Sequence, residues 1–75
     1  MKLKQVKPKK LLKALLKLGF IKKRQKGSHI FLEGYVNNQK KFTSISLHNE
    51  SIPRGTLKAI LKQTGVTEEE IIKYL

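Results

Sequence analysis

Histidine is the side chain in this sequence best suited to acid–base chemistry, and the chain has two of them. An imidazole can give and take protons near neutral pH without help from its surroundings. His29 ends the stretch Arg24-Gln25-Lys26-Gly27-Ser28-His29, so it follows a turn glycine and stands among cations. An exposed histidine is more often plain polar surface, and the same alternative holds for His48. Both residues are therefore candidates whose surroundings decide their role.

RNA is a substrate on which such a histidine could act with little further machinery. It brings its own nucleophile, the 2′-hydroxyl beside the scissile phosphate, so cleavage needs only proton transfer and stabilisation of charge. In this hypothesis His29 is the general acid or base and His48 is a second proton-transfer group. Lys26 and Arg24 would stabilise the negatively charged phosphorane.

Two other features suit a nucleic-acid ligand. Phe31 and Phe42 are expected on the same face as His29, where they could stack unpaired bases or be covered by a partner protein. Arg54-Gly55-Thr56 opens a predicted helix with free backbone amides, a cation and a hydroxyl, a combination that suits phosphate. The alternative for this segment is a plain helix start.

The charge of the chain indicates a polyanionic partner. Seventeen Lys and Arg residues stand against five acidic residues, which gives a formal net charge of +12. The excess is concentrated in residues 1–32, which contain most of the cations and no acidic residue. Such an excess attracts polyanions through counterion release. We therefore expect nucleic acid or an acidic protein as partner, with a purely solubilising charge as the alternative.

The composition argues against several other kinds of site. The chain has no cysteine, which removes disulfides, thiol nucleophiles and cysteine-based zinc sites. It also lacks aspartate and a Gly-rich phosphate loop, and two histidines without acidic neighbours make a poor metal site. We expect no metal and no cofactor. No apolar run is long enough to span a bilayer, so a cytoplasmic protein without a membrane partner is expected.

Apolar residues at helical spacing predict three helices within a single domain over residues 1–75. The first runs from Pro8 to a cap at Gly19, and the second from Pro53 to Gly65. A short third helix follows a capping box formed by Thr67 and Glu70. Residues 1–7 are expected to be a frayed basic arm. The apolar face of the first helix is predicted to comprise Leu12, Leu15 and Leu16, with Leu11 and Leu18 beside them.

Between these helices the apolar period changes to two, which predicts strands at 20–25, 28–33 and 40–47. The turns are expected at Lys26-Gly27 and Asn37-Asn38. A two-residue loop at the second turn pairs His29 with Ser46 and places both apolar sets on one face. It also sets His29 diagonal to His48, and a bulge at Gly34-Tyr35 is the alternative. The predicted fold is α+β, in the order α-β-β-β-α(-α), with helices on one face of a three-stranded antiparallel sheet.

Four stretches of the sequence form a pattern in a fixed order. They are Leu18-Gly19-Phe20, Arg24-Gln25-Lys26-Gly27-Ser28-His29, His48 and Pro53-Arg54-Gly55-Thr56-Leu57-Lys58-Ala59-Ile60-Leu61-Lys62-Gln63-Thr64-Gly65. Together they resemble the HicA (YcfA-like) family, which comprises mRNA interferase toxins of bacterial and archaeal toxin–antitoxin pairs. The resemblance runs in order from about Leu11 to Ile72. The segment Glu33–Lys40 departs from the family, because it is longer than a common His-Pro-Asp-Gly-type turn and lacks that motif.

The resemblance implies a fold like the double-stranded RNA-binding domain and a metal-independent endoribonuclease that acts on mRNA. It implies that His29 is essential, with His48 a weaker match. It also implies an acidic HicB-like antitoxin that covers the active surface and links the pair to DNA. The residues expected to bind RNA are Lys22, Lys23, Arg24, Lys26, Gly27, Ser28, Phe31, Arg54 and Thr56. Two readings without catalysis stay open: a basic RNA-binding module and a regulatory protein that binds only an acidic partner.

Overall fold

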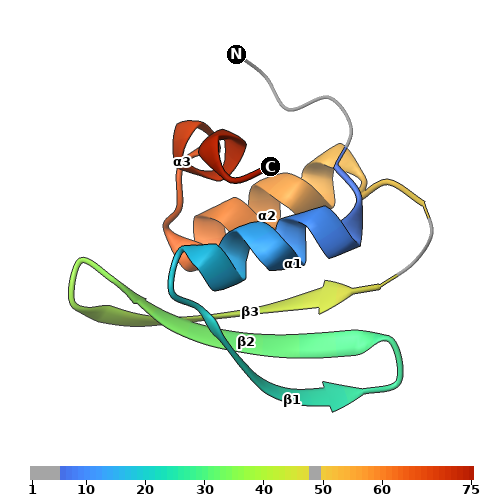
Figure 1. The fold of residues 1–75 in the computed structure, drawn as a ribbon, viewed down its shortest axis with the longest axis horizontal. Helices are drawn as coiled ribbons and strands as arrows, with labels where there is room; N and C mark the ends of the chain where they lie inside the picture. Colours follow the sequence, from blue (N-terminus) through green and yellow to red (C-terminus); the bar gives the residue numbers. More distant parts are fainter. Residues whose placement is uncertain (1–5, 48–49) are drawn as a thin grey trace.

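The computed structural model describes residues 6–47 and 50–75, and it has the predicted α+β architecture. Three helices lie on one side of a three-stranded antiparallel sheet (Figure 1). Helices α1 and α2 both pack on strand β3, and α3 contacts α1. The elements in chain order are α1 Pro8–Lys17, β1 Ile21–Lys26, β2 His29–Val36, β3 Gln39–Ser46, α2 Arg54–Thr64 and α3 Glu68–Lys73.

Strand β2 lies at the centre of the sheet, and its pairing with β3 has the predicted register. The pairing runs without a bulge from His29 opposite Ser46 to Val36 opposite Gln39. The connecting residues Asn37 and Asn38 have φ angles of 52° and 64°, as a type I′ turn requires at its two central positions. The two-residue loop is confirmed, and the alternative of a bulge at Gly34-Tyr35 is wrong.

The pairing of β1 with β2 differs from the prediction at its turn. The turn residues are Gly27 and Ser28 rather than Lys26 and Gly27, because Lys26 pairs with His29. Gly27 has a φ of 60°, which an L side chain tolerates poorly and which suits the first central position of a type II′ turn. Nearer the start of β1, the register with β2 shifts between Lys22 and Arg24, so that Lys23 forms a bulge.

The core lies between the sheet and the helices, and the face that α1 buries differs from the prediction. Its buried apolar side chains include Leu11, Ala14 and Leu15, whereas Leu16 is 43% exposed. Leu11, Ala14 and Leu15 follow the i, i+3, i+4 spacing of one helical stripe, and Leu16 lies off it. The core comprises Val6, Leu11, Ala14, Leu15, Phe20, Ile30, Leu32, Ile45, Leu57, Ile60, Leu61, Val66 and Ile71.

The chain segment before α1 is part of the domain where the structure describes it. Val6 is buried, and its carbonyl accepts a hydrogen bond of 2.8 Å from the backbone N–H of Ile52. Val6 thus belongs to the core rather than to the expected arm 1–7. Lys7 is the N-cap residue of α1, and its carbonyl accepts hydrogen bonds from the backbone N–H groups of Lys10 and Leu11, so it does not belong to a frayed arm either. The rest of that prediction, at residues 1–5, lies outside the described residues.

The two C-terminal helices have the predicted caps. The Thr67 hydroxyl accepts a hydrogen bond from the backbone N–H of Glu70, whose carboxylate accepts one from the backbone N–H of Thr67. This confirms the capping box. The predicted apolar face of α2 is also confirmed, with Leu57, Ile60, Leu61 and Thr64 all buried. Within the described ranges, no helix has the length and apolar character needed to cross a membrane.

Candidate active site

His29 is the first residue of β2 and is exposed. Side chains alternate along this strand, so that Ile30 and Leu32 face the helices while His29 and Phe31 face the other side. We call that other side the outer face of the sheet. The prediction that a strand presents His29 to solvent is confirmed.

The His29 ring is held by a residue from the neighbouring strand. Ser46 pairs with His29 across β2 and β3, and its Oγ lies 2.9 Å from Nδ1 of the ring. A hydroxyl can either donate to or accept from an imidazole nitrogen, so this contact is compatible with both neutral tautomers. With Nδ1 engaged, Nε2 is the nitrogen that can meet a ligand.

A pocket of about 370 Å³ opens beside this pair. It lies where the end of β3, the segment before α2 and the first turn of α2 meet. Its lining residues are Pro8, His29, Ser44, Ile45, Ser46, Glu50, Ser51, Ile52, Pro53, Thr56 and Ile60. Thr56, which the sequence predicts as a phosphate ligand, therefore shares a cavity with His29, whereas Arg54 is not among the described lining residues.

The predicted cations divide between the two sides of the sheet. Lys26 pairs with His29 and Arg24 with Phe31, so both belong to the outer face. The guanidinium carbon of Arg24 lies 5.2 Å from the centroid of the Phe31 ring. Lys22 pairs with the inward-facing Leu32, and its Nζ donates a 3.2 Å hydrogen bond to the side chain of Gln25. Lys22 is thus the one predicted cation of β1 that points away from His29.

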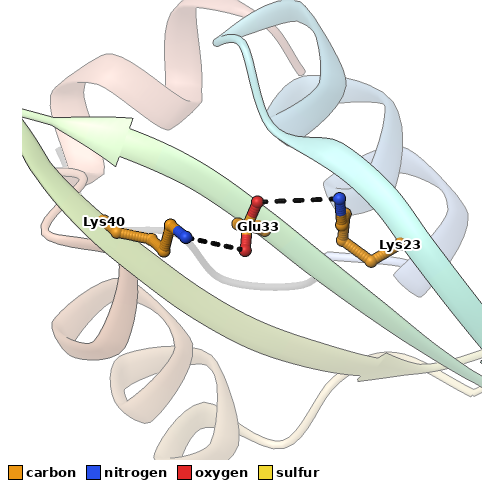
Figure 2. A network of polar contacts seen from close by, with 3 residues as sticks. All are labelled: Lys23, Glu33 and Lys40. Carbon is orange, nitrogen blue, oxygen red and sulfur yellow. Dashed lines mark ion pairs between the residues drawn. The ribbon is translucent and has the colours of Figure 1, made fainter.

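Lys23 lies on the outer face through its ion pair with Glu33. The carboxylate of Glu33 is bridged by Lys23 at 3.8 Å and by Lys40 at 3.7 Å (Figure 2). Lys40 lies on β3, and its Nζ is 6.0 Å from the centroid of the Phe42 ring. A second, shallower hollow of about 630 Å³ spans this region, lined by Lys23, Arg24, Phe31, Leu32, Glu33, Phe42, Thr43, Ser44 and Gln63.

The remaining predicted site residues have structural or undescribed positions. Gly27 and Ser28 form the turn before His29, and the Ser28 carbonyl accepts a 2.7 Å hydrogen bond from the backbone N–H of Leu47. His48 lies outside the described residues, so its predicted diagonal relation to His29 stays a prediction. Among the described residues, no group of three or more potential metal-ligating side chains is found.

Residues 8–66 match the protein family described as "HicA toxin of bacterial toxin-antitoxin". The chain belongs to the HicA toxin family. It is therefore the toxin of a toxin–antitoxin pair, and its partner is an antitoxin. No curated protein matches the chain. The matched region includes His29, Ser46 and Thr56, which means that the pocket lies within the part of the chain that defines this HicA toxin.

Sequence reasoning missed two features of the HicA site. The pairing of His29 with Ser46 was predicted, but the hydrogen bond between their side chains was not. The predicted register could have indicated it, because it places the two side chains opposite each other on one face. Glu50 lines the pocket although nothing in its local sequence marks it. Its placement there follows from tertiary packing.

Proposed function

We propose that this HicA-family toxin is an endoribonuclease that cleaves mRNA, with His29 as general acid or base. The observation that carries the proposal is the exposed imidazole, held through Nδ1 by Ser46 at the edge of a pocket. An exposed ring with one nitrogen fixed and the other available has the geometry that proton transfer to or from a bound substrate requires. Its basic surroundings favour an RNA phosphate as that substrate.

The reaction follows from the chemistry of RNA. Nε2 of His29 accepts the proton of the 2′-hydroxyl, and O2′ attacks the adjacent phosphorus to form a 2′,3′-cyclic phosphate. The bond from phosphorus to O5′ breaks, and O5′ takes up a proton. Because O2′ and O5′ lie on opposite sides of phosphorus in an in-line displacement, a second proton-transfer group is expected. The alternative order, with His29 as the acid, requires a second group in the same way.

Candidates for the second group are limited. His48 was predicted for this role from the sequence. Among the described lining residues of the pocket, Glu50 is the titratable side chain besides His29. Lys26 and Arg24 are better suited to stabilising the phosphorane. Lys26 pairs with His29 on the outer face, and Arg24 lies two residues before Lys26 on the same face of β1.

The first turn of α2 supports phosphate binding in the same pocket. Backbone N–H groups in the first turn of a helix have no partner within the helix, and they attract anions together with the helix dipole. Thr56 lines the cavity shared with His29 and adds a hydroxyl-bearing side chain to it. Arg54, the first residue of α2, is exposed and adds positive charge at this end of the helix.

The finer identity of the partners belongs to the same proposal. We take the antitoxin to be an acidic HicB-like protein that covers the His29 surface, and through which the pair contacts DNA. The net charge of +12 supports an acidic partner as well as an RNA substrate. The expected place of action is the cytoplasm, where mRNA is found.

The test is a His29→Ala variant compared with the native chain. The variant is expected to lose cleavage of a single-stranded mRNA fragment and to lose growth arrest on expression. Its circular dichroism and its affinity for RNA should be retained, because the ring is exposed. Cleavage that persists in His29→Ala removes His29 from the mechanism. A native chain that binds RNA without cleaving it would instead be a binding module.

A further inference from the structure

Large apolar side chains gather on the outer face of the sheet, which the three described helices leave uncovered. Phe31, Tyr35 and Phe42 are all exposed there, Phe42 by 60% and Tyr35 by 66%. The helices lie on the opposite side of the sheet (Figure 1). Three exposed aromatic rings on one face form an apolar patch, and such patches usually mark an interaction site.

Two of these rings are each accompanied by a cation. Arg24 lies 5.2 Å from the Phe31 centroid, and Lys40 lies 6.0 Å from the Phe42 centroid. A ligand with alternating flat π-systems and negative charges would satisfy both kinds of group at once. Single-stranded RNA has that chemistry, since its bases can stack on aromatic rings while its phosphates meet Arg and Lys.

The spacing of the rings fits successive nucleotides. Phe31 on β2 pairs with Ser44 on β3, and Phe42 lies two residues before Ser44. The rings of Phe31 and Phe42 are therefore diagonal neighbours on adjacent strands. Such neighbours are about 7–8 Å apart. Aromatic residues on adjacent strands of a sheet stack two or three bases in other single-stranded RNA-binding domains. His29 is two residues from Phe31 on the same face, about 7 Å along the strand. Bases stacked here would flank the phosphate at His29.

Glu33 sets the orientation of such a strand. It pairs with Phe42 and lies two residues from Phe31, which places a carboxylate beside both rings. Lys23 and Lys40 hold it from the two neighbouring strands (Figure 2). By pairing with both ammonium groups, the carboxylate offsets the charge that they would otherwise offer to phosphate, and it can also accept hydrogen bonds from the amino groups of bases. The centre of the face therefore favours bases over backbone, with phosphates at the cationic edges.

We propose that the outer face is a base-reading platform for single-stranded RNA, on which Phe31 and Phe42 stack two bases next to His29 while Glu33 offsets the charge of its two lysine partners and meets base edges. The choice of RNA as ligand rests on the proposed function. The platform itself is a statement about binding, which is measured separately from cleavage.

Binding is therefore tested in the full chain carrying His29→Ala, which keeps the RNA intact. The probe is a fluorescently labelled single-stranded 8-nucleotide RNA, compared with a duplex of the same sequence. Phe42→Leu and Phe31→Leu should each weaken single-strand binding about tenfold and leave duplex binding unchanged, whereas Phe42→Tyr should retain it. The salt dependence should not move, since no charge is altered. Tyr74→Leu, at an exposed ring on the helical side, is the matched control and should have no effect.

Glu33 is tested with a second probe, an RNA of the same length in which the central nucleotides lack bases. In the His29→Ala background, adding Glu33→Gln should raise the affinity for this abasic RNA. The ratio of the affinity for base-bearing RNA to the affinity for abasic RNA should therefore fall severalfold. Glu69→Gln changes the net charge equally at an exposed position on α3 and should leave the preference unchanged.

The results separate the two proposals. Equal single-strand affinity in Phe42→Leu, Phe31→Leu and the control overturns the platform, as does an equal loss on duplex RNA. A face that holds only an acidic protein partner would give the first of these results. If the Leu variants lose affinity but the native chain cleaves nothing, the platform stands and the endoribonuclease proposal fails.

Discussion

The hydroxyl of Ser46 lies 2.9 Å from Nδ1 of His29, joining two residues that face each other across β2 and β3. This contact couples the chemistry proposed for the imidazole to the register of the sheet. A one-residue slip of β3 would turn the Ser46 side chain to the helical side and leave the ring without this support.

Ser46→Ala is expected to lower the rate of RNA cleavage about five- to tenfold, the value of one hydrogen bond that orients the ring. Ser46→Thr should retain most of the rate, because it keeps the hydroxyl. The measurement is the single-turnover cleavage rate as a function of pH, with thermal unfolding to confirm the fold. Ser44→Ala, a neighbouring serine in the same pocket, is the control. Rates that fall equally in Ser44→Ala and Ser46→Ala would show that the hydrogen bond has no special role.

The register behind this contact was predictable because two independent signals agreed. The alternation of apolar residues from Ile30 to Ile45 and the turn at Asn37-Asn38 required the same pairing. Strand β1 offered no such signal. Ile21 is its single apolar residue, so its sequence has no apolar alternation from which the bulge at Lys23 could have been inferred, and all six residues are exposed.

Two other features needed the tertiary structure. Helix α1 contains leucines on two adjacent stripes, and the pattern alone did not decide that Leu11 would be buried and Leu16 exposed. His29 and Thr56 line one pocket because of where α2 begins relative to β3. The residues were identified separately from the sequence, but the shared pocket follows from packing.

The division of cations between the two sides of β1 gives a test with a matched pair. Lys26→Gln removes a charge beside His29 and should weaken single-stranded RNA binding, with the salt slope reduced by about 0.7 for one lost phosphate contact. Lys22→Gln removes the same charge from the helical side of the strand and should change the slope less. Both are measured by anisotropy titrations in His29→Ala across a range of salt. Equal slopes for the two variants would place the RNA backbone elsewhere.

Thr56 and Arg54 should have separable effects. Thr56→Val keeps the shape of this pocket-lining side chain but removes its hydroxyl. It is expected to lower kcat/KM about tenfold or more, the value of a hydrogen bond to a charged phosphate. Arg54→Gln should act mainly on affinity and its salt dependence. Steady-state cleavage at low and high salt distinguishes the two. A Thr56→Val variant with native kcat/KM would remove the α2 terminus from the site.

Gly34 gives a test of the packing that supports the sheet. A Cβ at this position would lie 2.8 Å from Cγ and Cδ2 of the buried Phe20 ring, closer than non-bonded carbon atoms can approach. Gly34→Ala should therefore lower the free energy of unfolding by about 1–3 kcal/mol. A Cβ at Gly55, in the first turn of α2, meets nothing within 4 Å, so Gly55→Ala should be neutral or raise stability by up to about 1 kcal/mol. Urea unfolding measures both. Because the strain lies in a single ring contact, Phe20→Leu should lower the free energy of unfolding less in the Gly34→Ala background than in the native chain. If the two losses of stability are additive instead, Phe20 does not set the requirement for glycine at position 34.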